Sequence, residues 1–307
     1  MEHLAQRLLR KLRERHFARI ARGVLATPPV RARDDGVILF SMIGTRVVAP
    51  YLIAAKSFHA QLGRGRFVIL DDGTLTPADR AVLARHLDHP EIRPIAAVSP
   101  GDCPRGSCWE RLLVLLELRR THYVIQLDSD TVTVGPVDEV AAAIAAGRSF
   151  TLRGDASAEL QDAAHFAGDP AAMPPTSHVQ ALIEAGLHRI DAGLPRPLRY
   201  VRGCAGFAGF APGGRGREVA DAFSREARAL LGAAKWAEWG SEQVMSNVIV
   251  ANEPDPLLLP YARYMNYWAE RALGPVSLVH FLGTHRYDRG CYPRVARAAI
   301  ARLAGTD

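Results

Sequence analysis

Alternation between short apolar runs and helical segments constrains the fold of this chain more than any other feature. The apolar runs cover residues 37–44, 66–73, 92–98 and 123–130, and the helical segments between them cover 46–62, 76–87 and 108–120. Thr76 and Pro77 are residue types that favour the N-cap and the first position of a helix. Strands that alternate with helices predict an α/β fold with a mainly parallel, Rossmann-like central sheet flanked by helices.

The second half of the chain is less regular. Residues 161–200 are rich in Pro and Gly, which predicts a connector or a mobile loop. Residues 204–214 read as a strand whose glycines allow close approach of another backbone. A helix is expected to begin at Ser241 as its N-cap, and the apolar run 276–281 contains His280.

Charge and cysteine usage narrow the function classes. The formal net charge is +6, but residues 1–25 hold seven Lys/Arg against Glu2 and Glu14, so the remainder is close to neutral. A nucleic-acid partner is therefore not expected. The four cysteines form no C-x-x-C pair, which predicts reduced thiols in a cytoplasmic protein. No apolar run is long enough to span a bilayer, and the N-terminus lacks the apolar block of a secretory signal.

The N-terminal segment predicts a basic amphipathic helix with a linker over residues 1–33, ahead of one domain over 34–307. Its apolar stripe consists of Leu4, Leu8, Leu12, Phe17, Ile20 and Val24. Two interpretations stay open: a helix docked on its own domain or on a dimer partner, and a helix lying on an anionic membrane surface at the inner face.

Two carboxylates end the apolar run "VIQLDSDTV". Asp128 and Asp130 are two residues apart, so on a strand both would point to the same side and repel each other. A divalent cation would offset this repulsion, and a solvated turn is the alternative. Ligands of doubly wound sheets bind beyond the carboxyl ends of the strands, which favours a site.

The pattern "DSDTV" also fits the D-x-D-x-[TV] motif of haloacid-dehalogenase-like phosphatases. That motif lies near the start of its domain, with its lysine and acidic pair downstream. Here three strand–helix units precede the motif, and the pair Asp71-Asp72 lies upstream. This order disfavours a phosphatase.

The ordered segments over about residues 37–290 resemble the family 8 glycosyltransferases, which are retaining enzymes of the GT-A fold. The resemblance rests on residues 67–87, on Arg111 placed 17 residues before the D-x-D, and on the segments "CAGFAGFAP", "SEQVMSNVI" and "VHFLGTHR". It implies a donor-binding half at about 34–135 and a smaller acceptor-side half at about 136–290.

The resemblance implies a metal-dependent site for a nucleotide-sugar. Asp128, Asp130 and His280 would bind a divalent cation, with Mn²⁺ favoured by the histidine nitrogen and Mg²⁺ as the alternative. The implied donor-binding residues are Ser41, Met42, Thr45, Asp72, Arg111, Asp128, Ser129, Gly206 and Arg286. The family's first strand commonly ends in an acidic stretch that contacts the nucleotide, and residues 41–45 lack this carboxylate. Uridine is the base that the resemblance implies.

The implied catalytic residues are Gln243 and Glu242, with Asp155 as an acceptor-contacting candidate. Cys204 stands where the family has Asn, and Val244 stands where it has a second Asp, so no carboxylate nucleophile is available there. This predicts a front-face mechanism in which the Gln243 amide steadies an oxocarbenium-like sugar.

Together these features predict a hexosyltransferase that moves a sugar from a UDP-sugar to a hydroxyl of a glycan or glycolipid. One alternative is a sugar-phosphate nucleotidyltransferase, but "SMIGTRVVAP" lacks the glycine-rich phosphate loop and lysine of that class. The other is a non-catalytic nucleotide-sugar or glycan-binding protein of the same fold. The presence of Asp128, Asp130, His280 and Gln243 weighs against it.

Overall fold

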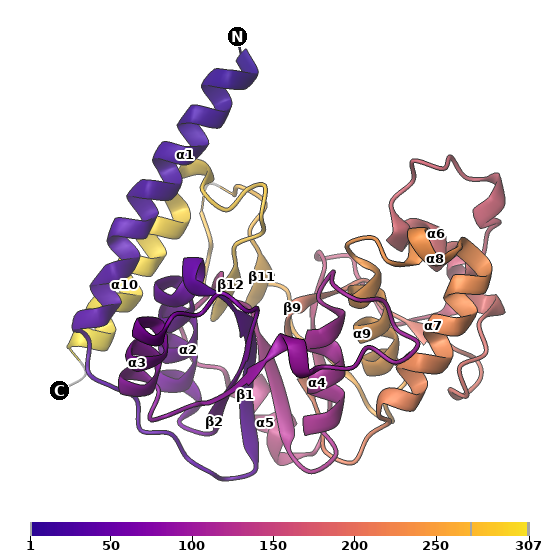
Figure 1. The fold of residues 1–307 in the computed structure, drawn as a ribbon, viewed down its shortest axis with the longest axis horizontal. Helices are drawn as coiled ribbons and strands as arrows, with labels where there is room; N and C mark the ends of the chain where they lie inside the picture. The colour runs from indigo at the N-terminus through magenta and orange to yellow at the C-terminus, as the bar shows by residue number, and fades with distance from the viewer. Residues whose placement is uncertain (1, 271, 306–307) are drawn as a thin grey trace. The chain divides into compact units, whose positions relative to one another are not determined.

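The computed structural model describes residues 2–270 and 272–305, with the side chains of the first helix described from Leu8 onward. Contacts divide the chain into two compact units. Unit 1 comprises Met1–Arg93, Leu127–Ala141 and Pro260–Asp307, and unit 2 comprises Pro94–Gln126 and Ala142–Leu259. Both units are therefore built from segments that are distant in sequence (Figure 1).

Unit 1 contains the N-terminal and C-terminal helices and the first strand–helix repeats. Its helices are α1 (Glu2–Ala21), α2 (Val48–Leu62), α3 (Pro77–His86) and α10 (Cys291–Ala304), with 3-10 turns η1 (Arg22–Ala26), η2 (Thr45–Val47) and η7 (Asp288–Gly290). Its strands are β1 (Val37–Ile43), β2 (Arg66–Asp71), β3 (Glu91–Pro94), β5 (Thr131–Thr133), β11 (Tyr264–Asn266) and β12 (Leu278–His280).

Unit 2 contains the central helices and the irregular excursion. Its helices are α4 (Trp109–Leu118), α6 (Val179–Gly186), α7 (Arg217–Leu231), α8 (Ala233–Trp236) and α9 (Ser241–Ala251), while α5 (Asp138–Ala145) begins in unit 1 and ends in unit 2. Its strands are β4 (Tyr123–Leu127), β6 (Phe150–Arg153), β7 (Gln161–Asp162), β8 (Arg199–Tyr200), β9 (Gly203–Phe210) and β10 (Leu257–Leu258). Its 3-10 turns are η3 (Ile95–Ala97), η4 (Ala163–Phe166), η5 (Pro170–Ala172) and η6 (Leu187–Arg189).

The main sheet has seven strands in the order β10-β6-β9-β4-β1-β2-β3, and smaller sheets have the orders β11-β12-β5 and β7-β8. β1 and β2 are parallel, with a register that runs from Ile38 opposite Arg66 to Ile43 opposite Asp71. β6 and β9 are antiparallel. The predicted α/β class with a central sheet and helices is confirmed.

Local sequence signals explain several element boundaries. Thr76 caps α3 as predicted: its side chain accepts from the backbone N–H of Asp79, and the Asp79 side chain accepts in return from the backbone of Thr76. The prediction that Ser241 caps α9 is wrong, because the N-cap is Gly240 at φ 103°. The Ser241 hydroxyl instead accepts from the buried indole N–H of Trp109 at 2.9 Å.

The third apolar run forms less strand than predicted. Strand β3 ends at Pro94, and a 3-10 turn occupies Ile95–Ala97. Proline lacks the N–H needed to continue a ladder, which accounts for the early end.

Each unit has its own apolar core. In unit 1, α2 buries nearly its whole length, including Tyr51 and Phe58. In unit 2, Trp109 packs edge-on against Trp236 with ring centroids 5.5 Å apart. A side chain at Gly209 would lie 2.1 Å from the Phe150 ring, so this glycine is what lets β9 lie against that aromatic residue.

The four cysteines are free thiols, in agreement with the absence of a C-x-x-C pair. Among the described residues, none of the helices combines the length and apolarity required to cross a membrane.

Candidate metal centre

Strand pairing in unit 1 gathers Asp128, Asp130 and His280. Asp128 directly follows β4, and Asp130 directly precedes β5. β5 pairs antiparallel with β12, with Thr131 opposite His280, and this places the histidine beside the D-x-D turn. One ligand atom from each of the three residues lies within 4.8 Å of the others. The prediction that these residues come together is confirmed.

Asp130 is the buried centre of this group. Its Oδ1 lies 3.2 Å from His280 Nε2, and its Oδ2 accepts from Arg286. Burial acts to raise the pKa of Asp130, but the charges of His280 and Arg286 and a hydrogen bond from His280 outweigh it and lower the pKa to about 2. Asp130 is therefore a carboxylate at neutral pH.

Backbone contacts hold Arg286 at the same place. The Arg286 guanidinium donates through Nε to the carbonyl of Phe281 at 3.1 Å, and the Phe281 amide donates to the carbonyl of Asp130 at 2.9 Å. The loop after β12 and the D-x-D turn are thus hydrogen-bonded to each other. The positively charged Arg286 guanidinium is therefore held beside the three candidate metal ligands.

Asn266 orients the histidine, a role that no sequence pattern indicated. β11 pairs with β12 so that Asn266 lies opposite His280, and the two side chains join Oδ1 to Nδ1 at 2.9 Å. An amide oxygen can only accept, so His280 Nδ1 carries the hydrogen. When His280 is neutral, it presents the lone pair of Nε2 toward Asp130, which is the tautomer required for metal ligation through Nε2. When His280 is protonated, Nε2 instead donates to the Asp130 carboxylate.

This arrangement fits a divalent cation. An Nε2 lone pair and a carboxylate oxygen 3.2 Å apart are two acceptors that face each other, and either a proton on His280 or a cation relieves their repulsion. Two carboxylates and one imidazole are hard oxygen and borderline nitrogen donors, a set that suits Mn²⁺ better than Mg²⁺.

The loops after β1 and β2 in unit 1 contain further predicted donor-binding residues. Thr45 donates its backbone N–H to Thr74 Oγ1 at 3.0 Å, and Asp72 accepts from the backbone N–H of Thr74 at 2.9 Å. A side chain at Gly44 would lie 2.1 Å from Asp72 Oδ2, so it would displace the Asp72 side chain. Hydrogen bonds therefore join the two loops.

Ser41, Met42 and Ser129 differ in accessibility. The Ser41 hydroxyl is buried and donates to the carbonyl of Leu127 at 2.6 Å, so it bonds within unit 1. Met42 and Ser129 are half-buried. The carbonyl of Ser129 accepts from the Tyr292 hydroxyl at 3.4 Å.

Unit 2 holds the other candidates, and two of them pair with each other. Arg111 Nη2 lies 3.2 Å from Glu242 Oε2, with the two side chains only 7% and 4% exposed. Gln243 is half-buried at the start of α9, and its Oε1 accepts from the Ala205 amide of β9 at 3.3 Å. Gly206 is buried in the same strand. Arg111 and Glu242 are thus a buried ion pair beneath the turn that carries Gln243.

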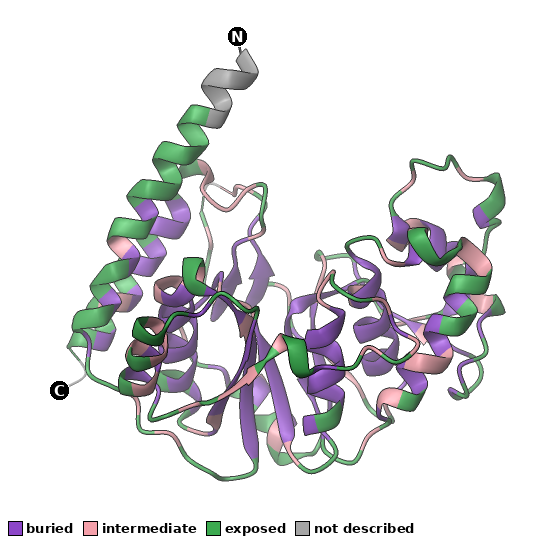
Figure 2. Cartoon of the chain, in the orientation of Figure 1, coloured by how far each residue is buried: buried purple, intermediate pink, exposed green. Residues whose placement is uncertain are grey.

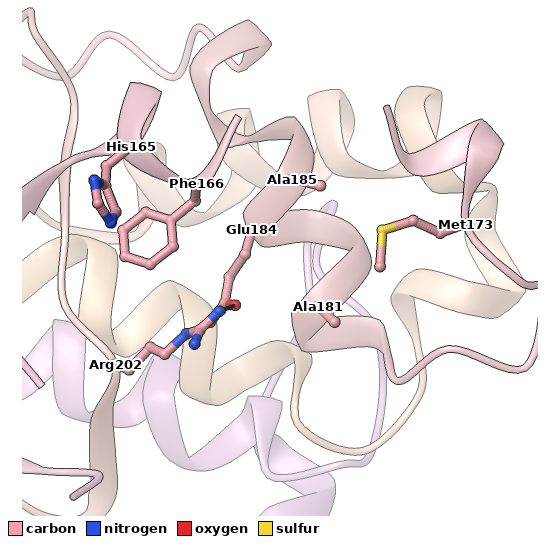
Figure 3. A pocket seen from close by; sticks show the side chains of 7 residues that line it. All are labelled: His165, Phe166, Met173, Ala181, Glu184, Ala185 and Arg202. Atoms are coloured by element: carbon pink, nitrogen blue, oxygen red, sulfur yellow. Dashed lines mark hydrogen bonds and ion pairs between the residues drawn. The ribbon is translucent and has the colours of Figure 1, made fainter. Parts of the chain in front are cut away.

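Asp155 lies elsewhere in unit 2, and it lines a small pocket. Its Oδ1 accepts from the backbone N–H and hydroxyl of Ser157 at 2.7 and 2.6 Å, and these hydrogen bonds lower its pKa. It lines a pocket of about 140 Å³ together with His165, Phe166 and Arg202. Those three residues also line a second pocket of about 450 Å³ (Figure 3).

Arg202 and Glu184 form a polar wall of the larger pocket. Arg202 donates to Glu184 Oε2 through Nε at 3.1 Å and Nη2 at 2.7 Å, and its guanidinium lies 5.2 Å from the centre of the Phe166 ring. Figure 3 shows Glu184 and Arg202 pointing toward each other, with Met173 farther along the wall. Such a wall combines an apolar ring with fixed hydrogen-bonding groups, which are the features of a small-molecule subsite.

Comparison with solved structures supports the fold. The bifunctional glycosyltransferase WbbM matches 89% of this chain with a TM-score of 0.51 at 13% identity, and this chain spans 50% of WbbM. The galactosyltransferase LgtC, solved in complex with donor and acceptor sugar analogs, matches 88% of this chain and 95% of its own length, at 16% identity and a TM-score of 0.49. Mouse xyloside xylosyltransferase 1 matches 81% and 97%, at 12% identity and a TM-score of 0.46.

At these identities the similarity establishes the fold alone. No protein-family model matches the chain, and no curated protein does either. The α/β fold expected from the sequence is thus found among glycosyltransferases, while membership of family 8 stays a prediction.

Proposed function

We propose that this chain is a metal-dependent, retaining glycosyltransferase that transfers a hexose from a UDP-sugar to a hydroxyl group of a glycan or glycolipid. The observation that carries the proposal is the Asp128–Asp130–His280 group, whose donor atoms fit a divalent cation and which has a fixed arginine beside it. The fold shared with WbbM supports the same class of reaction.

The residues of unit 1 would bind the diphosphate of the donor. Asp128, Asp130 and His280 would hold a cation whose chemistry is to offset, as a Lewis acid, the charge that builds on the leaving diphosphate. Asn266 keeps His280 in the ligating tautomer, and Arg286 would add a guanidinium suited to phosphate oxygens. Met42, Thr45, Asp72 and Ser129 are our candidates for further donor contacts, and uridine is the proposed base.

The residues of unit 2 would act on the sugar and the acceptor. The resemblance assigns Gln243 the place beside the anomeric carbon, and the buried Arg111–Glu242 pair would hold the turn that carries it. Val244 cannot act as a nucleophile, so the acceptor hydroxyl would pass its proton to the departing phosphate on the same face. Asp155, with the pockets around Arg202, is our candidate for acceptor binding.

The test is a donor panel followed by NMR. Purified protein is incubated with UDP- and GDP-hexoses in Mn²⁺ or in EDTA, and free sugar and nucleotide are measured. We expect slow hydrolysis of one UDP-sugar in Mn²⁺, none in EDTA, and a loss in Asp128→Ala but not in Glu226→Gln, an exposed acid on α7. Hydrolysis that is equal in EDTA, or an inverted anomeric product with an acceptor, would overturn the proposal.

A further inference from the structure

We propose that α1 docks on an anionic lipid surface through the face that it turns away from the rest of unit 1. The opposite face of α1 packs against other residues of unit 1. Phe17 is 2% exposed and stacks on Tyr292 of α10 with ring centroids 3.9 Å apart, and Arg13 forms an ion pair with Asp288 at 3.1 Å. The helix therefore packs on its own domain through one side, where α1 and α10 lie alongside each other (Figure 1).

The outward face carries three leucines. Leu8, Leu9 and Leu12 are 60%, 48% and 52% exposed. At 3.6 residues per turn they fall within an arc of about 100°, and Phe17 falls outside that arc. Figure 2 shows this part of α1 as exposed. The predicted single stripe is thus divided, with Phe17 turned inward and Leu8 and Leu12 outward; Leu4 lies outside the residues whose side chains are described.

Basic residues border the leucines. Lys11 follows Leu8 by three residues and Arg15 follows Leu12 by three, so each cation lies on the same face as a leucine. Lys11, Arg15 and Arg19 are exposed, and within the described part of the chain no ion pair involves them. Apolar side chains bordered by cations are the pattern of a helix that lies in the headgroup region of an anionic bilayer.

The charges favour lipid over a second copy of this chain. Two copies meeting through this face would bring two cationic borders together, and repulsion would oppose the contact. Anionic headgroups instead pair with the cations while the leucines enter the apolar layer. An anionic lipid surface is therefore the partner whose charge complements the basic excess of residues 1–25.

Docking would also orient the metal centre. Tyr292 stacks on Phe281 at 4.3 Å and donates its hydroxyl to the Ser129 carbonyl, so the residue that packs on Phe17 also touches the D-x-D turn. A membrane-bound α1 would hold this turn at a fixed orientation to the lipid. This corollary rests on the proposed function and fits a glycolipid acceptor, whereas lipid binding itself does not depend on catalysis.

The test is co-sedimentation with vesicles of phosphatidylcholine alone or with 30% phosphatidylglycerol. We expect binding to the anionic vesicles only. Neutralising one basic residue near an anionic surface costs about fivefold in affinity, so the triple variant Lys11→Gln, Arg15→Gln, Arg19→Gln should bind about 10²-fold more weakly. A triple Leu8→Ser, Leu9→Ser, Leu12→Ser variant should lose binding as well.

A charge-matched control keeps the test specific. Arg31→Gln, Arg85→Gln, Arg120→Gln changes three exposed arginines outside α1 and should bind as the wild type does. Equal binding to neutral vesicles, or unchanged binding of both α1 variants, would overturn the proposal. A dimer in light scattering that only the leucine variant abolishes would identify a second copy as the occupant instead. Hydrolysis of the donor in solution should be the same in all variants, which separates this test from that of the proposed function.

Discussion

Replacing Asn266 with Ala should weaken Mn²⁺ binding without touching a ligand. Asn266 is 1% exposed and His280 is 5% exposed, so bulk water is poorly placed to replace the lost hydrogen bond to Nδ1. Loss of such a partner of a metal-bound histidine costs about 10- to 100-fold in metal affinity, or about 1.4–2.7 kcal/mol. The N–H left unpaired should also lower the free energy of unfolding by about 1–3 kcal/mol in the absence of metal.

The assay is a titration with Mn²⁺ followed by the EPR signal of the free ion, with thermal melts in EDTA beside it. Asn266→Asp is the matched control, because its carboxylate still accepts from Nδ1; it should bind Mn²⁺ at least as tightly as the wild type. Wild-type affinity in Asn266→Ala would refute the role of the amide. An equal loss in both variants would show that shape at this position matters rather than the hydrogen bond.

Three further predictions concern catalysis and stability. Gln243→Ala should lower kcat by about 10²-fold with UDP affinity kept; steady-state kinetics and calorimetry test this, and lost UDP affinity would contradict it. Asp155→Ala should raise the KM for the acceptor while donor hydrolysis is unchanged, and an unchanged KM would remove Asp155 from the acceptor site. Burial lowers the pKa of Lys56 to about 8, so between pH 8 and about 10.4 the unfolded chain binds more protons than the folded one. The melting temperature of the wild type should therefore rise with pH relative to Lys56→Met over that range; a constant difference would contradict the assignment.

Sequence patterns predicted those features that depend on local signals. Alternating apolar and helical segments indicated the α/β fold, and Thr76 and Pro77 indicated where α3 begins. The Asp128–Asp130–His280 group was predictable from the order of segments in the resemblance. For the fold class and for α3 the signal lies in residue types at short spacing, which backbone geometry converts directly into position. His280 is distant in sequence from the two aspartates, and only the segment order of the resemblance connected them.

Features that depend on pairing between distant segments were not predictable. Asn266 is a single amide at the end of a short strand, and only the β11–β12 register places it opposite His280. No local pattern indicated that Arg111 and Glu242, far apart in sequence, form a buried ion pair. Serine favours the N-cap position, but the Ser241 hydroxyl oxygen accepts a hydrogen bond from the indole N–H of Trp109 instead. Tertiary hydrogen bonding overrode the local preference in these cases.

The central claim is that Asp128 and Asp130 hold a cation that binds the diphosphate of a nucleotide-sugar. Calorimetry of UDP binding with and without Mn²⁺, in the wild type, Asp128→Ala and Asp130→Ala, tests it most directly, with Glu226→Gln as the control and thermal melts to confirm folding. The account predicts that UDP binds the wild type and the control only when Mn²⁺ is present, and that it binds neither aspartate variant under any condition. UDP affinity that is independent of the metal and unchanged in both aspartate variants would contradict it.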